Sequence, residues 1–186
     1  MSEDALPALR ADFEREAGRS LSLPIAGAIV WTIAGIAAMF LPQQIATYVL
    51  LFGSGAIFPI GLAVAKLLGE NPIANNNPLS RLMGLCVLMV NLLWALHLTL
   101  LFEDASYFPL SLGIGLGLHW VVFSWIIGHS VGTIHAVLRT LLATALWWLL
   151  PVHPISAVAL GVVIAYSYSI FTLSRRPLAQ LVASRI

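Results

Sequence analysis

Charged residues are scarce in this sequence. Nine Lys and Arg and eight Asp and Glu make up 9% of its 186 residues, whereas hydrophobic residues make up 60%. A water-soluble domain carries about 25% charged residues, because its surface must face water. The shortage of charge therefore leaves two classes, a membrane protein or a very hydrophobic soluble core, and the length of the apolar segments decides between them.

Cysteine and intramembrane acids are also lacking. The single cysteine, Cys86, excludes a disulfide framework and argues against redox chemistry. Glu103 and Asp104 lie at the edge of an apolar segment and no acid lies within one, which counts against a cation-driven pump or a proton relay. The sequence shows no nucleophile–base pattern, no phosphate-binding glycine loop, no paired catalytic carboxylates and no basic patch for nucleic acid.

Long apolar segments fill the middle of the chain. A helix that crosses the hydrocarbon core of about 30 Å needs roughly 20 mostly apolar residues. Six segments have about this length: 21–41, 45–68, 82–102, 108–128, 131–150 and 154–173. Transmembrane strands would be about 10 residues long with alternating polarity, and no such alternation occurs. The sequence therefore predicts an all-α membrane protein, a bundle of about six transmembrane helices that forms one domain over residues 21–173.

The basic residues predict the orientation of this bundle, because Lys and Arg near helix ends collect on the cytoplasmic side. The loops 42–44, 103–107 and 152–153 carry no Lys or Arg. With both termini in the cytoplasm, all basic residues lie in the cytoplasmic segments or the cytoplasmic half of a span: Arg10, Arg15, Arg19, Lys66, Arg81, Arg139, Arg175, Arg176 and Arg185. Residues 1–20 and 174–186 are then cytoplasmic segments of a multi-pass protein in the inner (plasma) membrane.

Residues Asp4–Gly18 are expected to form a short helix with Leu6, Leu9 and Phe13 on one face. Two interpretations of this segment remain open. It is either a solvated tail or a helix that lies on the membrane surface.

Polar side chains inside the spans are the candidates for function, because burying them in hydrocarbon is costly. Arg139 lies about two turns inside the cytoplasmic end of the fifth span, where its charge costs roughly 2.5–3.5 kcal/mol on insertion scales. His135 lies one turn earlier on the same helix face. The pair would attract an anionic head group or a carboxylate. Alternatively, Arg139 reaches the interface and is held by lipid phosphate or by Glu70.

Asn91 and His119 form a second polar pair, near the centres of the third and fourth spans. These spans are antiparallel neighbours, so the two side chains are expected at similar depth, within reach of a hydrogen bond. The pair is either structural, with a stabilisation of about 0.6 kcal/mol on average, or a midplane site where His119 relays protons or orients a ligand. Trp94 and Trp120 also sit deep in these spans and either wall a ligand cavity or fill the core.

The second and fourth spans contain residues that break helices or let them pack closely. Pro59, between Gly55 and Gly61, predicts a kink or break in the second span, because proline removes a backbone hydrogen bond. Such a kink either lines a transport site or has no functional role. Gly113 and Gly117 predict close helix packing, inside one chain or between protomers.

No cofactor or metal is expected. His97 and His119 differ in depth by about 9 Å along their helices, which argues against a haem held by both. His129 and His135 flank a cytoplasmic turn, but no Cys or carboxylate is spaced to complete a metal site of three or four ligands.

Several short motifs between residues 77 and 125 carry a family resemblance. They are Asn77-Pro78-Leu79-Ser80-Arg81 before the third span, Asn91 within it, and Gly117-Leu118-His119 and Ser124-Trp125 in the fourth. Together they resemble an uncharacterised family of small bacterial multi-span integral membrane proteins. That family has no assigned activity, so the resemblance implies the topology, the interest of these positions and a bacterial inner membrane as location.

We therefore predict a polar pocket that opens toward the cytoplasm, near the kinked second span, and binds a ligand through Asn91, His119, His135 and Arg139. The favoured hypothesis is a small transporter or binding protein for an amphipathic or anionic small molecule or lipid. One alternative is a non-catalytic scaffold that forms a homo-oligomer. The other is a His-dependent membrane enzyme with a lipid-like substrate, so enzyme activity stays open, with no catalytic residue assigned. Membrane lipids are the expected partners, and nucleic acid is not.

Overall fold

The computed structural model describes residues 5–73 and 76–178. This part of the chain contains nine α-helices and no strand, which confirms the all-α class. The helices are α1 (Ala5–Ala17), α2 (Ser22–Phe40), α3 (Gln43–Leu68), α4 (Pro78–Leu92), α5 (Trp94–Glu103), α6 (Tyr107–Gly115), α7 (His119–Ile126), α8 (Val131–Leu149) and α9 (Pro154–Arg175). Of the C-terminal segment 174–186, residues 179–186, with Arg185, lie outside the described residues.

Five helical segments are long and apolar enough to cross a membrane: α2, α3, α4 with α5, α6 with α7, and α9. The chain is thus a multi-pass membrane protein. The two composite segments are each interrupted once, α4–α5 at Leu93 and α6–α7 at residues 116–118. The remaining long helix, α8, has 19 residues but is less apolar than the five, because it contains His135 and Arg139.

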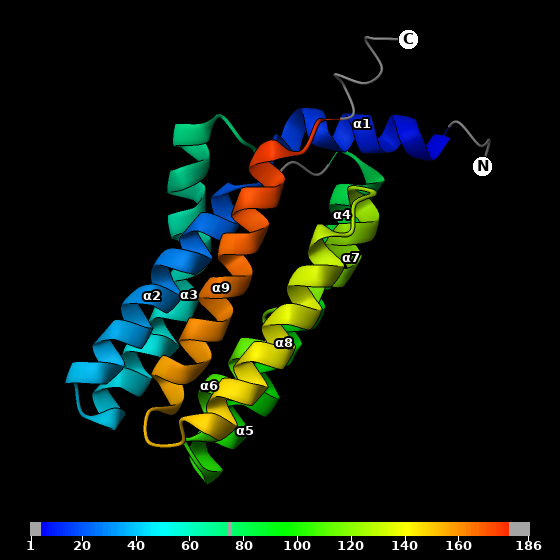
Figure 1. The fold of residues 1–186 in the computed structure, drawn as a ribbon. Helices are drawn as coiled ribbons and strands as arrows, with labels where there is room; N and C mark the ends of the chain where they lie inside the picture. The colour runs from blue at the N-terminus through cyan, green and yellow to red at the C-terminus, as the bar shows by residue number, and fades with distance from the viewer. Residues whose placement is uncertain (1–4, 74–75, 179–186) are drawn as a thin grey trace.

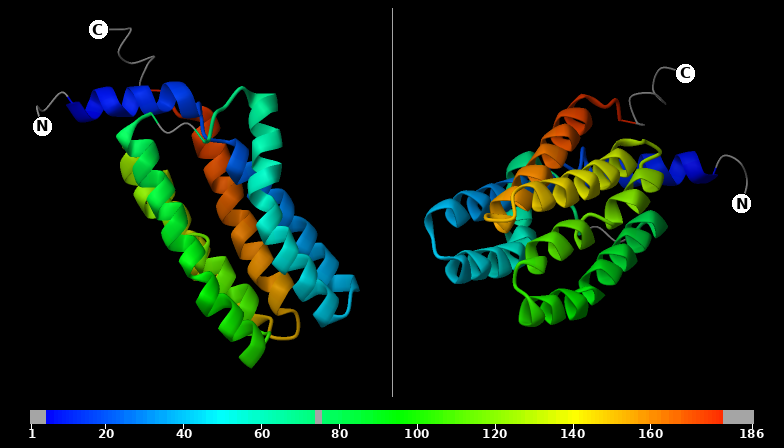
Figure 2. Two further views of the ribbon diagram at one scale, coloured as in Figure 1. Left: turned by 180° about the vertical axis from the view of Figure 1, so that it is seen from behind. Right: turned by 60° about the horizontal axis from the view of Figure 1, so that its bottom comes forward.

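The helices form two groups that meet along α8 and α9 (Figure 1). In one group, α2 packs against both α3 and α9; in the other, α8 packs against α7 and α6, and α4 packs against α7. The edges of the two groups, α3 and α4, do not pack against each other, although they follow one another in the chain. Seen from behind in Figure 2, these two helices diverge and α9 is visible between them.

Glycines allow the helices of the bundle to cross closely. A Cβ atom at Gly132 of α8 would lie 2.1 Å from the Trp120 backbone oxygen of α7, and one at Gly161 of α9 would lie 2.9 Å from the Ala143 nitrogen of α8. Gly113 faces Val158, whose Cγ1 would lie 2.7 Å from an added Cβ. The predicted close packing of the fourth span is therefore confirmed within one chain.

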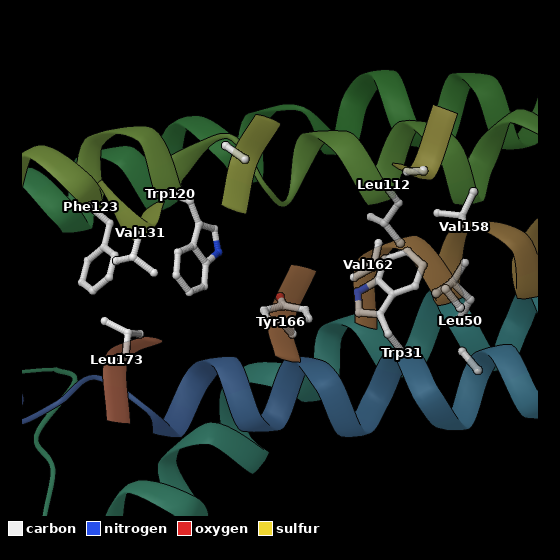
Figure 3. Packing of buried hydrophobic residues seen from close by; sticks show 14 of the residues in the cluster. Trp31, Leu50, Leu112, Trp120, Phe123, Val131, Val158, Val162, Tyr166 and Leu173 are labelled. Atoms are coloured by element: carbon white, nitrogen blue, oxygen red, sulfur yellow. The ribbon is translucent and has the colours of Figure 1, made fainter. Parts of the chain in front are cut away.

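The core lies between the two helix groups and continues along most of the bundle. Figure 3 shows side chains from α2, α6, α7 and α9 that meet there, with the Tyr166 ring between Trp120 and Trp31 in this view. Trp31, Phe108, Leu50 and Leu112 are completely buried.

α1 lies across one end of the bundle (Figure 1), where polar bonds attach it to several helices. Arg10 donates from Nη2 to the Trp125 carbonyl at 2.7 Å and caps the end of α7. Asn77, the N-cap of α4, donates from Nδ2 to the Asp12 carboxylate at 2.9 Å. The carboxylate of Glu14 forms a buried ion pair with Arg176 after α9. The N-terminal helix is therefore docked on the bundle and is not a solvated tail.

The turn at the opposite end, between α5 and α6, is held by short-range bonds. The Ser106 backbone N–H donates to Asp104 Oδ1 at 2.8 Å, and this bond holds the pKa of the Asp104 carboxyl below its usual value. Trp147 Nε1 of α8 donates to the Ser106 carbonyl at 2.9 Å. The indole thus connects α8 to the loop that precedes α6.

The helix interruptions occur where the sequence did not predict them. α3 runs without a break through Pro59, from Gln43 to Leu68, so the second span is not broken there, and the kink at Pro59 stays a prediction. A proline removes one backbone bond, and neighbouring helices can maintain the helix around it in apolar surroundings. The third and fourth spans, which have no internal proline after their first turns, are the ones interrupted, at Leu93 and at residues 116–118.

Candidate functional site

A cavity of about 590 Å³ lies between α3 on one side and α4 and α7 on the other, and we call it the α3–α4 cavity. Its walls are mainly apolar, with Phe58 from α3, Val87 and Val90 from α4 and Phe123 from α7. Ligand sites typically measure about 300–1,000 Å³ and combine apolar walls with a few polar groups. The size and lining of this cavity match such a site.

Two glycines leave the cavity open. Gly55 of α3 and Gly84 of α4 both line it, and a Cβ atom at either position would meet no atom within 4 Å. Glycine within a helix costs about 1 kcal/mol relative to alanine. Neither glycine is needed for close helix packing, so their effect on the structure is to widen the cavity.

The cavity is apolar along its length and polar at one end. α1 covers that end with Phe13 and Ala17. Ser80 and Arg81, in the first turn of α4, and Asn71, in the loop before it, supply polar side chains there, and Arg81 is exposed. A molecule in the cavity would therefore meet a cationic, hydrogen-bonding rim beside α1 and apolar walls further in.

Asn91 and His119 both line the α3–α4 cavity, as the sequence indicated, but they do not bond to each other. Asn91 Nδ2 donates to the Val87 carbonyl of its own helix at 2.8 Å. His119 is the first residue of α7, and its buried Nδ1 has no hydrogen-bond partner among the described residues. The two residues therefore belong to one cavity wall and do not form the structural pair that was the alternative.

His135 and Arg139 are completely buried in the middle of the bundle and do not line the cavity. The Trp120 ring stacks on His135, with ring centroids 3.9 Å apart, and Tyr166 lies 5.2 Å from the Arg139 guanidinium. Both aromatic side chains also line the cavity. Of the four predicted ligand-binding residues, Asn91 and His119 therefore line the cavity. His135 and Arg139 lie behind the aromatic side chains of its wall.

Arg139 does not reach the membrane interface. It lies at the middle of α8, and its Nε donates to the Gly113 carbonyl of α6. Glu70 is bound elsewhere: its carboxylate accepts from the Leu21 and Ser22 backbone N–H groups, each at 2.9 Å, at the N-terminus of α2. The alternative in which Arg139 extends to lipid phosphate or to Glu70 is therefore wrong, because the guanidinium is held inside the bundle.

The interruption of the fourth span provides the acceptor for Arg139. In a regular α-helix the Gly113 carbonyl would accept from the N–H four residues later. Here the Gly117 N–H bonds instead to the Ile114 carbonyl at 2.9 Å, in a tighter turn that ends α6. Gly117 also makes room for the arginine, because a Cβ there would lie 2.9 Å from Arg139 Cδ.

His135 connects α8 to α9. Its Nδ1 lies 2.8 Å from Ser169 Oγ and 3.1 Å from the Ala165 carbonyl. His97 lies apart from this cluster, between α5 and α6, where its Nδ1 is 3.2 Å from Ser111 Oγ. In residues 5–73 and 76–178, no group of three or more His, Cys, Asp or Glu side chains is arranged to hold a metal ion.

Sequence analysis missed two parts of the site. Tyr166 had no visible signal, and it fits against α2 only because Gly27 has no side chain: a Cβ there would lie 2.5 Å from the tyrosine ring. Gly84 was also missed. An isolated glycine in a helical pattern, as at position 84, was the available signal for the width of the cavity.

Comparison with known proteins gives one match. The model of a family of unknown function (DUF7010) matches residues 6–176, a range that includes every residue lining the α3–α4 cavity. No curated protein and no solved structure gives a significant match.

Proposed function

The chain belongs to this family of unknown function (DUF7010), and we propose that it binds or carries an amphipathic small molecule or lipid within the membrane. The observation that carries the proposal is the α3–α4 cavity of about 590 Å³. Its apolar walls suit an acyl chain, and its few polar groups, among them Asn91, His119 and Arg81, suit a head group.

The position of the cavity supports a lipid-like ligand over a water-soluble one. α3 and α4 do not pack against each other, so the cavity lies at the boundary between the two helix groups. In a bilayer this boundary faces acyl chains. A single-chain amphiphile could enter between α3 and α4 and keep its apolar part in contact with apolar surfaces throughout.

The other two hypotheses lack a specific observation in their favour. A homo-oligomeric scaffold was motivated by the glycines of the fourth span, but Gly113 and Gly117 pack against Val158 and Arg139 of the same chain. A His-dependent enzyme needs a second group within hydrogen-bond reach of the histidine. For His119, the Asn91 amide bonds to its own helix. His135 and His97 each have a serine hydroxyl within reach, Ser169 at 2.8 Å and Ser111 at 3.2 Å, but neither histidine lines the cavity.

We place α8 in the membrane as a sixth span. Both termini then lie in the cytoplasm, and the protein is in the inner membrane of the cell. The packing of α8 along α9 supports the sixth span. With this orientation α1 lies at the cytoplasmic surface, and the polar rim of the cavity opens toward the cytoplasm. The basic residues Arg10, Arg15, Arg19 and Arg81 then all face the cytoplasmic side.

Cysteine labelling tests this orientation. In a Cys86→Ser background, a membrane-impermeant maleimide added to whole cells should label Gln44→Cys, in the first turn of α3. It should label Asn71→Cys, in the α3–α4 loop, only after the cells are permeabilised. Labelling in the opposite order would overturn the topology.

Filling the cavity tests the binding function. Gly84→Leu should lower the bound fraction of hexadecanol and hexadecanoate at least about tenfold, a change of about 1.4 kcal/mol in binding free energy, because the new side chain extends into open space. The measurement is native mass spectrometry of purified protein with each probe. Ala95→Leu, which introduces the same side chain at an exposed position of α5, is the control and should bind both probes like the wild type. Equal binding by the two variants would count against a ligand cavity here.

A further inference from the structure

Arg139 carries a positive charge in the centre of the bundle without an acidic partner. Its side chain is 0% exposed, and neither Nη1 nor Nη2 has a hydrogen-bond partner among the described residues. The acidic residues of the chain lie within the first sixteen positions, at Glu70 and at residues 103–104, and none lies inside a span. Arginine stays protonated in proteins. A buried charge without a partner is strongly destabilising, so the guanidinium requires an anion.

Three polar nitrogen atoms on the side chains around Arg139 also lack a hydrogen-bond partner among the described residues. Trp31 Nε1, His135 Nε2 and His119 Nδ1 are buried and have no partner in the part of the chain that the structure describes. The Trp31 ring lies 5.7 Å from the guanidinium carbon. Indole and guanidinium nitrogens only donate hydrogen bonds. The unpaired donors of the cluster are therefore Trp31 Nε1 and the two Nη groups of Arg139, which an oxyanion would complement. His135 Nε2 is an acceptor, because Nδ1 of the same ring donates to the Ala165 carbonyl.

Of the three guanidinium nitrogens of Arg139, Nη1 and Nη2 have no hydrogen-bond partner among the described residues. Nε is held by the Gly113 carbonyl, and aromatic rings lie near it on the α2 and α9 sides, Trp31 and Tyr166. The two Nη groups remain, and their fork matches the two oxygens of a carboxylate or phosphate in a bidentate pair.

Two aromatic side chains connect the surroundings of this guanidinium to the α3–α4 cavity. Tyr166 lines the cavity and lies 5.2 Å from Arg139, and Trp120 lines it and stacks on His135. For a head group in the cavity to reach Arg139, the Tyr166 ring would have to turn away from Gly27, against which it packs. Figure 3 shows Tyr166 between Trp120 and Trp31 in the core.

We propose that Arg139, with Trp31 Nε1 beside it, binds the anionic head group of a single-chain amphiphile whose apolar chain occupies the α3–α4 cavity. The inference rests on the proposed binding function and adds the ligand class, an oxyanion attached to an acyl chain. A fatty-acid carboxylate and a phosphate monoester share this chemistry. Arg139 supplies the charge and the bidentate bonds, and the cavity supplies the apolar contacts.

The test compares three probes with the same chain and different heads: hexadecanoate, hexadecyl phosphate and the neutral hexadecanol. Native mass spectrometry at pH 8.5 gives the bound fraction of each for the wild type, Arg139→Met, Arg139→Lys and Gly84→Leu. The wild type should prefer at least one oxyanion over the alcohol about tenfold or more, and the preferred one identifies the source of the head group. Arg139→Met should lose this preference and still bind hexadecanol. Arg139→Lys should retain part of it, because lysine keeps the charge without the fork.

The outcomes separate the two proposals. If the wild type binds the alcohol as tightly as both oxyanions, the assignment of Arg139 is overturned while the cavity remains a binding site. If Gly84→Leu binds every probe like the wild type, the binding function itself fails. A wild type without the preference for an oxyanion overturns the inference even where Arg139→Met does not fold. Arg81→Met, at the cavity rim, should keep the preference; its loss in that variant would assign the head group to the rim and overturn the inference. Where Arg139→Met does fold, thermal unfolding gives an independent readout: the preferred oxyanion should raise the Tm of the wild type and not that of Arg139→Met.

Discussion

Replacing Gly132 with alanine should prevent the bundle from assembling, whereas alanine at Gly84 should leave it at least as stable as the wild type. A Cβ at Gly132 would lie 2.1 Å from the Trp120 backbone oxygen and 3.0 Å from the Ser124 nitrogen. These are backbone atoms of α7, so no rotamer change can make room, and α8 must move away as a whole. Overpacking typically costs about 1–3 kcal/mol and occasionally more; we expect about 3 kcal/mol or more here.

The control in this experiment is the same chemical change at a position with free space. A Cβ at Gly84 meets nothing within 4 Å, and alanine is favoured over glycine in a helix by about 1 kcal/mol. Thermal unfolding of the purified proteins in mild detergent, with the yield of monodisperse protein, gives both results. A Gly132→Ala protein that unfolds at the wild-type temperature would show that α7 and α8 do not cross as closely as described.

Removing one partner of the buried pair between Glu14 and Arg176 should release α1 from the bundle. The two side chains are only 2% and 6% exposed. Loss of one partner from a buried ion pair typically costs about 3–5 kcal/mol, because the other charge is left buried. Glu14→Ala should therefore raise the population of undocked α1 by about two to four orders of magnitude, measured as the rate at which proteinase K cleaves the N-terminal segment.

An exposed pair in the same helix provides the matched control. The side chains of Arg15 and Asp12 are 66% and 39% exposed, and their ion pair is a surface pair worth about 0–1 kcal/mol. Arg15→Ala should be cleaved at nearly the wild-type rate. Replacing both buried partners with leucine should recover much of the protection, because apolar side chains of similar volume leave no unpaired charge. Equal cleavage of Glu14→Ala and Arg15→Ala would mean that the buried pair does not hold α1.

The positions of the membrane helices could be predicted from sequence because hydrocarbon imposes a length and a polarity on them. The predicted segment 21–41 corresponds to α2 at Ser22–Phe40, and 154–173 corresponds to α9 at Pro154–Arg175. The interruptions could not be predicted from proline. Pro59 stays within a continuous helix, and the break at residues 116–118 coincides with the bond from Arg139 to Gly113, a contact between residues far apart in sequence.

The candidate site was predictable in its residues more than in its geometry. Asn91 and His119 lie in one cavity because their spans are antiparallel and bring them to similar depth. Nothing in the sequence gives the rotation of α8, which turns His135 toward Ser169 and places Arg139 behind Tyr166. The free space between α3 and α4 could not be predicted from the sequence either. A glycine in a helix indicates either close packing or an opening. Only the structure shows that a Cβ at Gly84 would meet no atom within 4 Å.

The bond between Arg139 and Gly113 also bears on how the chain enters the membrane during synthesis. An arginine near the centre of a helix opposes insertion by roughly 2.5–3.5 kcal/mol, so α8 is poorly suited to partition into lipid alone. Its acceptor in α6 and the Trp31 ring in α2 precede it in the chain and are already in place when it emerges from the ribosome. The order of the helices is then an order of assembly, in which α8 joins a preformed surface of earlier helices and α9 covers it last.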